Sequence, residues 1–315
     1  GVDALIGYTQ RFRRRWLVAK EKVSTGALGD ISTVTSRAFL NRLVAINNYQ
    51  RESAPELNSP MVISGTHALD IVMWMMEGKT PVEIYARSVD KALGKSMKGT
   101  DATTAVMSFS DGTLYNSIVN WALPVTWPGA VYGLEVGIVG TEGVITIDDT
   151  HSDFVMAVSR PQAMGYVADN SRLVDFVGST PAGDMALGAL RGPMYEETQS
   201  WLMRLATGMP TIHATAAEGH HRLMLAKAYD LSARIKAPVV QDYTKALGGG
   251  EYSTRLGHRK CATITKNINP LCATACRWQH LINNETHVCV TIVSEFWWDD
   301  MCSQPGHIIC EDRKS

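Results

Sequence analysis

The sequence predicts an α+β fold, in which helices pack on one face of a predominantly antiparallel or mixed open sheet. Two pairs of segments with alternating apolar residues are each joined by a short turn that contains glycine, as in β-hairpins. Segments with helical periodicity come before and after these hairpins. Hairpins flanked by helices are typical of a sheet that is covered by helices on one side.

The first 40 residues predict a strand end, a helix and a strand. Residues 1–7 run apolar into Gly7 and are interpreted as the tail of a buried strand. Residues 14–25 place apolar side chains on one helical stripe, and Gly26 follows as the stop signal. Residues 31–40 alternate between apolar and polar side chains, which predicts a strand.

The next hundred residues predict one buried helix, over residues 65–77, and several strands. The segment Asp111-Gly112 indicates a tight hairpin, and we expect positive φ at both of its central positions. A second hairpin turns at Gly140-Thr141-Glu142. The predicted strands of this region span residues 82–89, 103–109, 113–121, 133–139 and 143–148.

Two helices are predicted to close the domain. Residues 151–190 carry scattered proline and glycine and are interpreted as strands broken by loops. The first closing helix spans residues 193–207 and has Pro193 at its first position. The second spans residues 215–235 and carries an apolar face.

The composition changes near Gly248-Gly249-Gly250. All six cysteines lie beyond this point, and 13 of the 14 methionines lie before it. We therefore predict one domain over residues 1–245 and a Cys-rich appendage over residues 246–315 that is poorly ordered and adds no structure to the sheet domain. The cysteines are Cys261, Cys272, Cys276, Cys289, Cys302 and Cys310.

The appendage leaves several interpretations open. Cys272, Cys276 and His280 have a four-residue spacing that would suit zinc on a helix, but the Cys-x2-Cys pairs of zinc ribbons are absent, so no metal site is predicted. Disulfides fit the even cysteine count, yet no secretory signal supports them. A sequencing, splicing or reading-frame artefact explains the change in composition at least as well.

Charge and hydropathy exclude several classes of protein. The chain has 30 Lys+Arg against 31 Asp+Glu, a formal charge of -1, whereas nucleic-acid binders normally carry a basic excess. No segment approaches 18 uninterrupted apolar residues, and the first 20 residues lack the layout of a signal peptide. We therefore expect a soluble cytoplasmic protein with no nucleic-acid or membrane partner.

Five segments occur in the order found in one enzyme family. Together they resemble the Gfo/Idh/MocA family of oxidoreductases over about residues 1–241. The segments are Gly7-Tyr8-Thr9-Gln10-Arg11-Phe12, Ser24-Thr25-Gly26-Ala27-Leu28-Gly29, Gly65-Thr66-His67-Ala68-Leu69-Asp70, Gly137-Ile138-Val139-Gly140-Thr141-Glu142-Gly143, and Ser232-Ala233 with Pro238-Val239.

The resemblance implies a two-domain enzyme of which this chain holds the second part. Members of the family have an N-terminal Rossmann domain that binds NAD or NADP, and a C-terminal α+β domain that holds a sugar or polyol and forms oligomers. Residues 1–245 then correspond to the substrate and oligomerisation domain, with residues 1–7 as a remnant of the last Rossmann strand. We expect a homo-oligomer that forms through the sheet.

The cofactor domain is expected to be missing, so the chain alone is expected to be inactive. The sequence has no Gly-x-Gly-x-x-Gly turn to seat a pyrophosphate and no Glu-Lys-Pro motif, whose lysine is catalytic in the family. Gly137, Gly140 and Gly143 do not substitute for that turn, because they lie within a predicted hairpin. NAD or NADP is therefore expected to bind the full-length relative and not this chain tightly, and cofactor-binding residues stay unknown.

His67 is the candidate catalytic residue. The polar side chains of the helix over residues 65–77 are His67, Asp70, Trp74 and Glu77, and their spacing places them on one face. A position in the first turn lowers the imidazole pKa, and a neutral imidazole can take the proton of an alcohol as general base. The alternative is a histidine that caps the helix or hydrogen-bonds within the core.

The resemblance supports a catalytic His67 only in part. The family's catalytic histidine begins this helix and is preceded four residues earlier by an aspartate, but Ile63 stands at that position here. The candidate substrate contacts are Arg11, Asn41, Arg42 and Asp70. A solvent-exposed helix start (Arg11), a surface loop (Asn41 and Arg42) and packing or a salt bridge (Asp70) are the alternatives.

The leading hypothesis is therefore a fragment of an NAD(P)-dependent oxidoreductase that acts on a sugar, polyol or related hydroxy compound. One alternative is a non-catalytic carbohydrate-binding or oligomerising module, which the isoleucine at position 63 favours. Another is a zinc-stabilised interaction protein built on the appendage.

Overall fold

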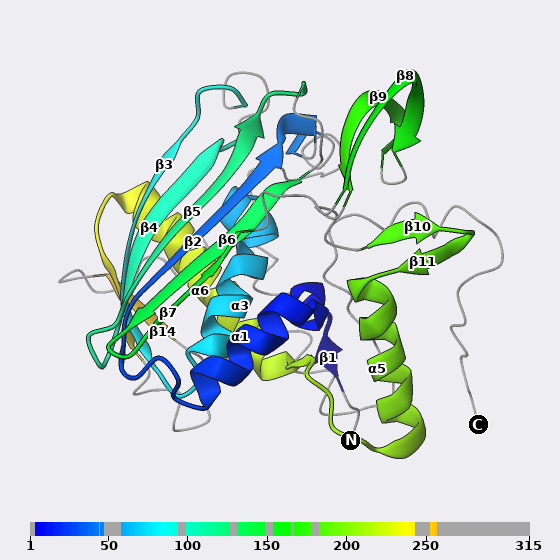
Figure 1. The fold of residues 1–315 in the computed structure, drawn as a ribbon. Coiled ribbons are helices and arrows are strands. Elements are labelled where there is room, and N and C mark those ends of the chain that lie inside the picture. The colour runs from blue at the N-terminus through cyan, green and yellow to red at the C-terminus, as the bar shows by residue number, and fades with distance from the viewer. Residues whose placement is uncertain are drawn as a thin grey trace, which may run out of the picture.

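One open mixed sheet forms the centre of the molecule, with strand order β14-β13-β3-β4-β5-β2-β6-β7 (Figure 1). The computed structural model describes residues 4–43, 45–46, 58–93, 99–126, 131–148, 154–164, 167–177, 183–242 and 253–256. Only the β2–β5 pair is parallel among the described neighbours in this sheet. The strands are β2 (Ile31–Asn41), β3 (Pro81–Val89), β4 (Ala102–Phe109), β5 (Leu114–Leu123), β6 (Val131–Gly140), β7 (Val144–Ile147), β13 (Val239–Asp242) and β14 (Ser253–Leu256).

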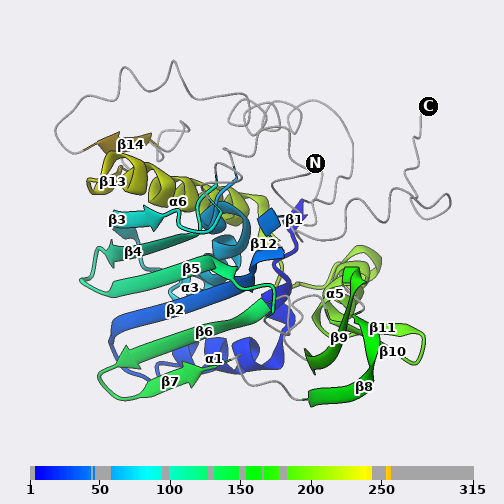
Figure 2. The same ribbon diagram turned by 90° about the horizontal axis from the view of Figure 1, so that it is seen from above.

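Three helices cover one face of the sheet, as the sequence predicts (Figure 2). They are α1 (Arg14–Ser24), α3 (Thr66–Met75) and α6 (Ala216–Ile235). Trp16 of α1, Leu69 of α3 and Leu225 of α6 are buried together with the inward side chains of the strands in one apolar core. Removal of this apolar surface from water is the main stabilising contribution to the fold, at roughly 25 cal/mol per Å².

The N-terminal segment is held between the helices. Strand β1 (Leu5–Ile6) pairs antiparallel with β12 (Ala214–Thr215), directly before α6. The 3-10 helix η1 (Thr9–Phe12) follows β1 and packs against α5 (Pro193–Thr207). The hairpin of β10 (Asp184–Ala186) with β11 (Ala189–Arg191) leads into α5, and the hairpin of β8 (Phe154–Met164) with β9 (Val167–Val177) lies above it in the view of Figure 1.

Most predicted elements are confirmed with small shifts of their ends, but two details are wrong. The segment Ser253–Leu256 pairs antiparallel with β13, although residues 246–315 were expected to add no structure to the sheet domain. Strand β13 pairs with β3 on one side, so its other edge carries the backbone N–H and C=O groups with which β14 pairs. In the β4–β5 turn only Gly112 has positive φ, 89°, so Asp111 does not adopt the expected conformation. The rest of the appendage, with the six cysteines, lies outside the described residues.

No helix among the described residues is long and apolar enough to cross a membrane.

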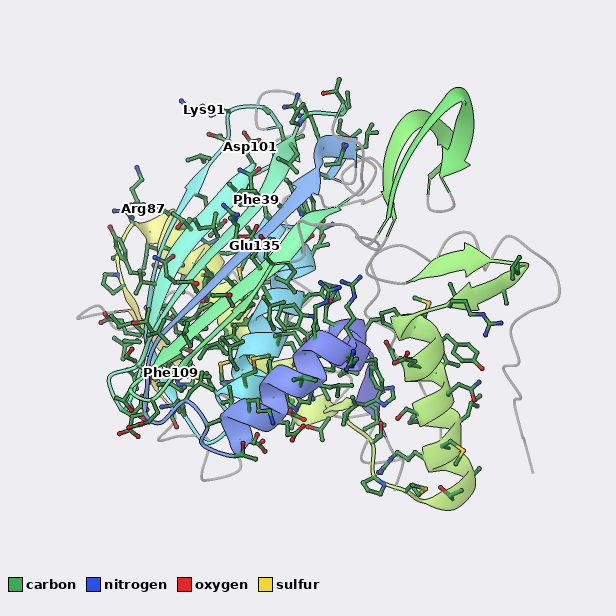
Figure 3. All side chains as sticks on the ribbon, in the orientation of Figure 1. Phe39, Arg87, Lys91, Asp101, Phe109 and Glu135 are labelled. Carbon is green, nitrogen blue, oxygen red and sulfur yellow. The ribbon has the colours of Figure 1, made fainter. Side chains whose placement is uncertain are left out.

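The carboxylate of Asp101 holds one end of the sheet together. Asp101 is buried, and it accepts hydrogen bonds from the backbone N–H groups of Lys91, Ala92 and Leu93 at 2.5, 2.5 and 2.6 Å (Figure 3). These bonds close the chain between β3 and β4. They also set Leu93 against Trp121 in a second, smaller apolar cluster.

Asp101→Ala should therefore destabilise the protein by about 2 to 4 kcal/mol, because three backbone N–H groups lose a buried, charged acceptor. Urea unfolding followed by tryptophan fluorescence measures the change. Asp90→Ala, at an exposed position of the same connection, serves as the matched control and should change stability by less than about 0.5 kcal/mol. Equal effects of the two substitutions would contradict this role of Asp101.

Candidate functional site

The start of α3 lies against the ends of β2 and β5. The indole Nε1 of Trp121 in β5 donates a hydrogen bond of 2.7 Å to Ser64 Oγ, just before α3. Gly65 permits this approach, since a Cβ there would stand 2.9 Å from Val119 Cγ2 and 2.6 Å from Met61 Sδ. Ser64, three residues before His67, is thus held at the end of β5, where Leu123 pairs with Asn41 of β2.

A π-helical turn, η3 (Met61–Gly65), leads into α3. Such turns are rare and frequently occur at functional sites. Ile63 lies in this turn and packs against the small apolar cluster around Leu40 and Trp121. The position four residues before His67 is therefore occupied by an apolar side chain in apolar surroundings.

His67 is half-buried and electrically neutral. Burial lowers the pKa of its imidazole from 6.5 to about 4. Its Nδ1 is buried and has no hydrogen-bond partner among the described residues. The ring of Tyr8 stands edge-on to the imidazole, with ring centroids 6.1 Å apart and planes at 87°. A lowered pKa was predicted from the helix terminus, and the structure assigns the lowering to burial.

The polar stripe of α3 faces the N-terminal segment. Tyr8 Oη and Thr66 Oγ1 are 3.2 Å apart. Lys20 Nζ donates to the carbonyl of Trp74 at 2.6 Å and to Glu77 at 2.7 Å. The polar side chains of α3 thus lie on one face of the helix, as their spacing predicts. Much of this face contacts residues 8–20, and we call this contact surface the seam.

Arg11 and Asp70 form the centre of this seam. The guanidinium of Arg11 donates to both carboxylate oxygens of Asp70, at 2.7 and 2.6 Å, and the two residues are 2% and 0% exposed. Arg11 also donates to Ile212 O and to Glu218, each at 3.2 Å. Burial raises the pKa of Asp70, while Arg11 and the nearby Arg222 oppose that rise. The hydrogen-bonding capacity of these two candidate substrate contacts is used within the fold.

The remaining two candidates lie at the end of β2. Asn41 is 1% exposed, and its Oδ1 accepts a hydrogen bond from the backbone of Leu43 at 3.0 Å. Arg42 donates from NH2 to Ala122 O at 3.1 Å and keeps part of its surface exposed. Of the four predicted substrate contacts, Arg42 alone is not buried.

A second buried polar group, not predicted from the sequence, lies between η1 and α5. Glu197 of α5 is only 7% exposed, and burial raises the pKa of its carboxyl. Its Oε1 would stand 2.1 Å from a Cβ at position 7, so Gly7 is what allows the contact. His213 packs against Phe12 with ring centroids 4.7 Å apart. A glutamate within an amphipathic helix looks like a surface residue, so the sequence holds no signal for this burial.

Metal binding gains no support from the described residues, which contain no cluster of three or more His, Cys, Asp or Glu side chains suited to an ion. The cysteines and histidines of the appendage lie outside that part of the chain.

The three shielded histidines predict a stability profile in acid. Burial lowers the pKa values of His67, His213 and His221 from 6.5 to about 4. These histidines therefore bind more protons in the unfolded chain than in the folded protein between these pH values, so their contribution to stability is complete above about pH 6.5 and is lost as the pH drops toward 4. Thermal unfolding between pH 7.5 and 4 should show this decline, and His213→Gln should reduce its slope. A flat profile would contradict the shielding.

Comparison with known proteins agrees with this architecture. Residues 16–146 match the family model described as GFO/IDH/MocA C-terminal domain. This confirms the resemblance and the fold class that it implies. No curated protein matches the sequence.

Solved structures share the fold at low sequence identity. A myo-inositol 2-dehydrogenase from Lactobacillus plantarum aligns with a TM-score of 0.52 and 18% identity, over 74% of this chain and 63% of that one. GenD2 from gentamicin A biosynthesis, in complex with NAD, aligns at 0.57 and 19%, over 75% and 63%. A scyllo-inositol dehydrogenase from Lactobacillus casei with bound NAD(H) and scyllo-inositol aligns at 0.50 and 17%, over 74% and 63%. The chain thus spans slightly less than two thirds of the length of these structures.

Proposed function

We propose, from the premise that residues 16–146 are a GFO/IDH/MocA C-terminal domain, that this chain supplies the substrate-holding part of an NAD(P)-dependent oxidoreductase acting on a polyol or sugar. One observation carries the proposal. His67 is kept neutral in the first turn of α3, and Ser64 just before this helix is bound to the end of β5, which lies beside the end of β2 where Arg42 is partly exposed. The inositol dehydrogenases with the same fold support the substrate class.

The two residues have distinct roles in this proposal. The buried nitrogen of His67 is Nδ1, so Nε2 is the nitrogen that meets the substrate hydroxyl and exchanges its proton. Arg42 donates hydrogen bonds to a neighbouring hydroxyl and fixes its position. Positioned proton transfer of this kind is worth roughly 10²- to 10⁴-fold in rate.

The three glycines of the β6–β7 hairpin do not fit the phosphate-binding turn of a dinucleotide site. Gly137 and Gly140 lie within β6, and Gly143 lies in the turn to β7, as the sequence predicts, so these glycines do not join a strand to a helix N-terminus. Calorimetry of this chain with NADH and NADPH at about 100 μM should show no saturable heat, because a Kd well below that concentration needs a phosphate cradle. A micromolar Kd would contradict this part of the proposal.

Polyol binding tests the proposed function directly. Titration of the chain with myo-inositol and scyllo-inositol, followed by NMR of the histidine imidazoles, should shift the His67 signals and leave those of His213 unchanged. Arg42→Ala should weaken binding, because it removes donors to a hydroxyl. Absence of any His67 shift at tens of millimolar polyol would overturn the proposal.

The non-catalytic module is the second candidate function, and Ile63 favours it. Both candidates bind a polyol, but only the oxidoreductase brings the ligand to His67. Binding that shifts other signals and leaves those of His67 unchanged would select the module.

The face of the sheet turned away from the helices is proposed to join copies of this chain. Apolar side chains of neighbouring strands are exposed on it, among them Tyr85 of β3, Val106 of β4 and Ile118 of β5. Phe39 and Glu135 lie on the neighbouring strands β2 and β6 (Figure 3). Contiguous exposed apolar surface of this kind marks interaction sites. Sedimentation should show an oligomer that Ile118→Lys dissociates, and a monomeric wild-type chain would contradict it.

A further inference from the structure

Among the described residues, no hydrogen bond to Nδ1 fixes the orientation of the His67 ring. In histidine sites a carboxylate or carbonyl usually accepts the Nδ1 proton and thereby fixes both the tautomer and the ring. Here Nδ1 is buried and has no partner among the described residues. Another contact must then hold the imidazole in place.

Tyr8 is the side chain that makes such a contact. Its ring meets the imidazole edge-on at 6.1 Å and 87°, within the geometry that aromatic pairs prefer. Tyr8 is 3% exposed, so its own ring is fixed by packing. We propose that Tyr8 is the positioning residue of His67, and that ring packing takes the place of the missing hydrogen bond.

The backbone around Tyr8 is anchored on both sides. Three residues further on, Arg11 is locked to Asp70 by two charge-assisted hydrogen bonds. On the preceding side, β1 pairs with β12, and Gly7 lies against Glu197. The Tyr8 ring is therefore carried by a fixed segment. Its hydroxyl is 3.2 Å from Thr66 Oγ1, on the residue before His67.

The ring and the hydroxyl of Tyr8 contribute differently. Burial, followed by the nearby Asp70, raises the pKa of Tyr8 to about 12, so the hydroxyl stays protonated and neither gives nor takes a proton near neutral pH. Arg11 and Arg222 are the other charged groups that act on it, and they oppose the rise. Tyr8 thus acts on His67 through shape and shielding from water.

Substitutions that separate ring from hydroxyl test the proposal. We expect Tyr8→Phe and Thr66→Val to leave the NMR signals of His67 and its pKa of about 4 unchanged, because the ring remains. Tyr8→Leu removes the ring, so the His67 pKa should rise toward 6.5 and its signals should show exchange between ring orientations. His221 serves as the internal reference, since its pKa should stay at about 4 in every variant.

Two results would overturn the proposal. The first is an unchanged His67 pKa in a folded Tyr8→Leu variant. The second needs no substitution: in the wild-type chain, nuclear Overhauser contacts between the Tyr8 ring protons and the imidazole protons of His67 must be present, and their absence contradicts the geometry.

A role of this packing in catalysis rests on the proposed function, but the packing itself can be tested without it. If Tyr8→Leu changes the pKa of His67 but polyols do not shift the His67 signals, this inference stands and the proposed function fails. If polyols shift the His67 signals but Tyr8→Leu leaves the His67 pKa unchanged, the proposed function stands and this inference fails.

Discussion

Asp70→Ala is expected to destabilise the protein by about 3 to 5 kcal/mol, because it leaves the guanidinium of Arg11 buried without its main partner. Arg222 also loses a counter-ion, since its Nε lies 3.4 Å from Asp70. Glu218 is the carboxylate that remains, but it is only partly buried and makes a longer contact of 3.2 Å with Arg11. Differential scanning calorimetry and urea unfolding measure the loss.

An exposed ion pair of the same seam gives the matched control. Glu77 pairs with Lys20 at 2.7 Å, but 78% of its side chain is exposed. Exposed pairs contribute about 0 to 1 kcal/mol, so Glu77→Ala should have a small effect. Asp70→Asn tests the charge itself, because the amide keeps one acceptor for Arg11 and should recover part of the loss. Similar stabilities for Asp70→Ala and Glu77→Ala would contradict the buried seam.

The elements of the fold could be predicted because their signals are local. The Asp111-Gly112 turn lies between two alternating segments, and the helix over residues 193–207 begins at a proline and ends before Gly208, so the neighbouring residues carry the information. Strand β14 could not be predicted in this way. Its four residues form a strand because they meet the free edge of β13, and pairing with an edge is a property of the assembled sheet.

The candidate site could be predicted only up to its residue types. The spacing of His67, Asp70 and Trp74 correctly places them on one face of α3, but it does not say what that face contacts, and α3 ends at Met75, before Glu77. Arg11, the partner of Asp70, lies 59 residues away in the sequence, and its pairing follows from how η1 docks on α3. The residue type of Asp70 therefore suggests a substrate contact, whereas its position in the fold makes it the ion-pair partner of Arg11.

Burial also determines the role of charged residues outside the candidate site. Glu197 and Asp101 have the sequence context of surface carboxylates, yet both are buried. Asp101 is held by three backbone amides, whereas one oxygen of Glu197 has no partner among the described residues. Only the three-dimensional arrangement distinguishes a carboxylate that ties a loop from one that is left partly unsatisfied.

His67→Ala should lower kcat for polyol oxidation about 100-fold or more, with little change in KM, in a protein that joins this chain to an NAD(P)-binding domain, if His67 exchanges the substrate proton as proposed. The fold should survive, because the residue is half-buried and its ring makes no hydrogen bond through Nδ1. Reduction of NAD⁺ or NADP⁺ measured by absorbance gives kcat, and the midpoint of thermal unfolding checks the fold. An unchanged kcat would make His67 a structural residue and favour the binding module.

Ile63→Asp tests the effect of giving Nδ1 of His67 a hydrogen-bond acceptor, which it lacks among the described residues. A carboxylate that reaches Nδ1 would hold the proton there, turn Nε2 into an acceptor and raise the imidazole pKa above its present value of about 4. We then expect a higher kcat, and none of this gain should remain in the double variant with His67→Ala. The opposing effect is the loss of Ile63 from the apolar cluster around Trp121, which should lower the unfolding midpoint. A higher kcat that persists without His67 would show that the carboxylate acts on the reaction by another route.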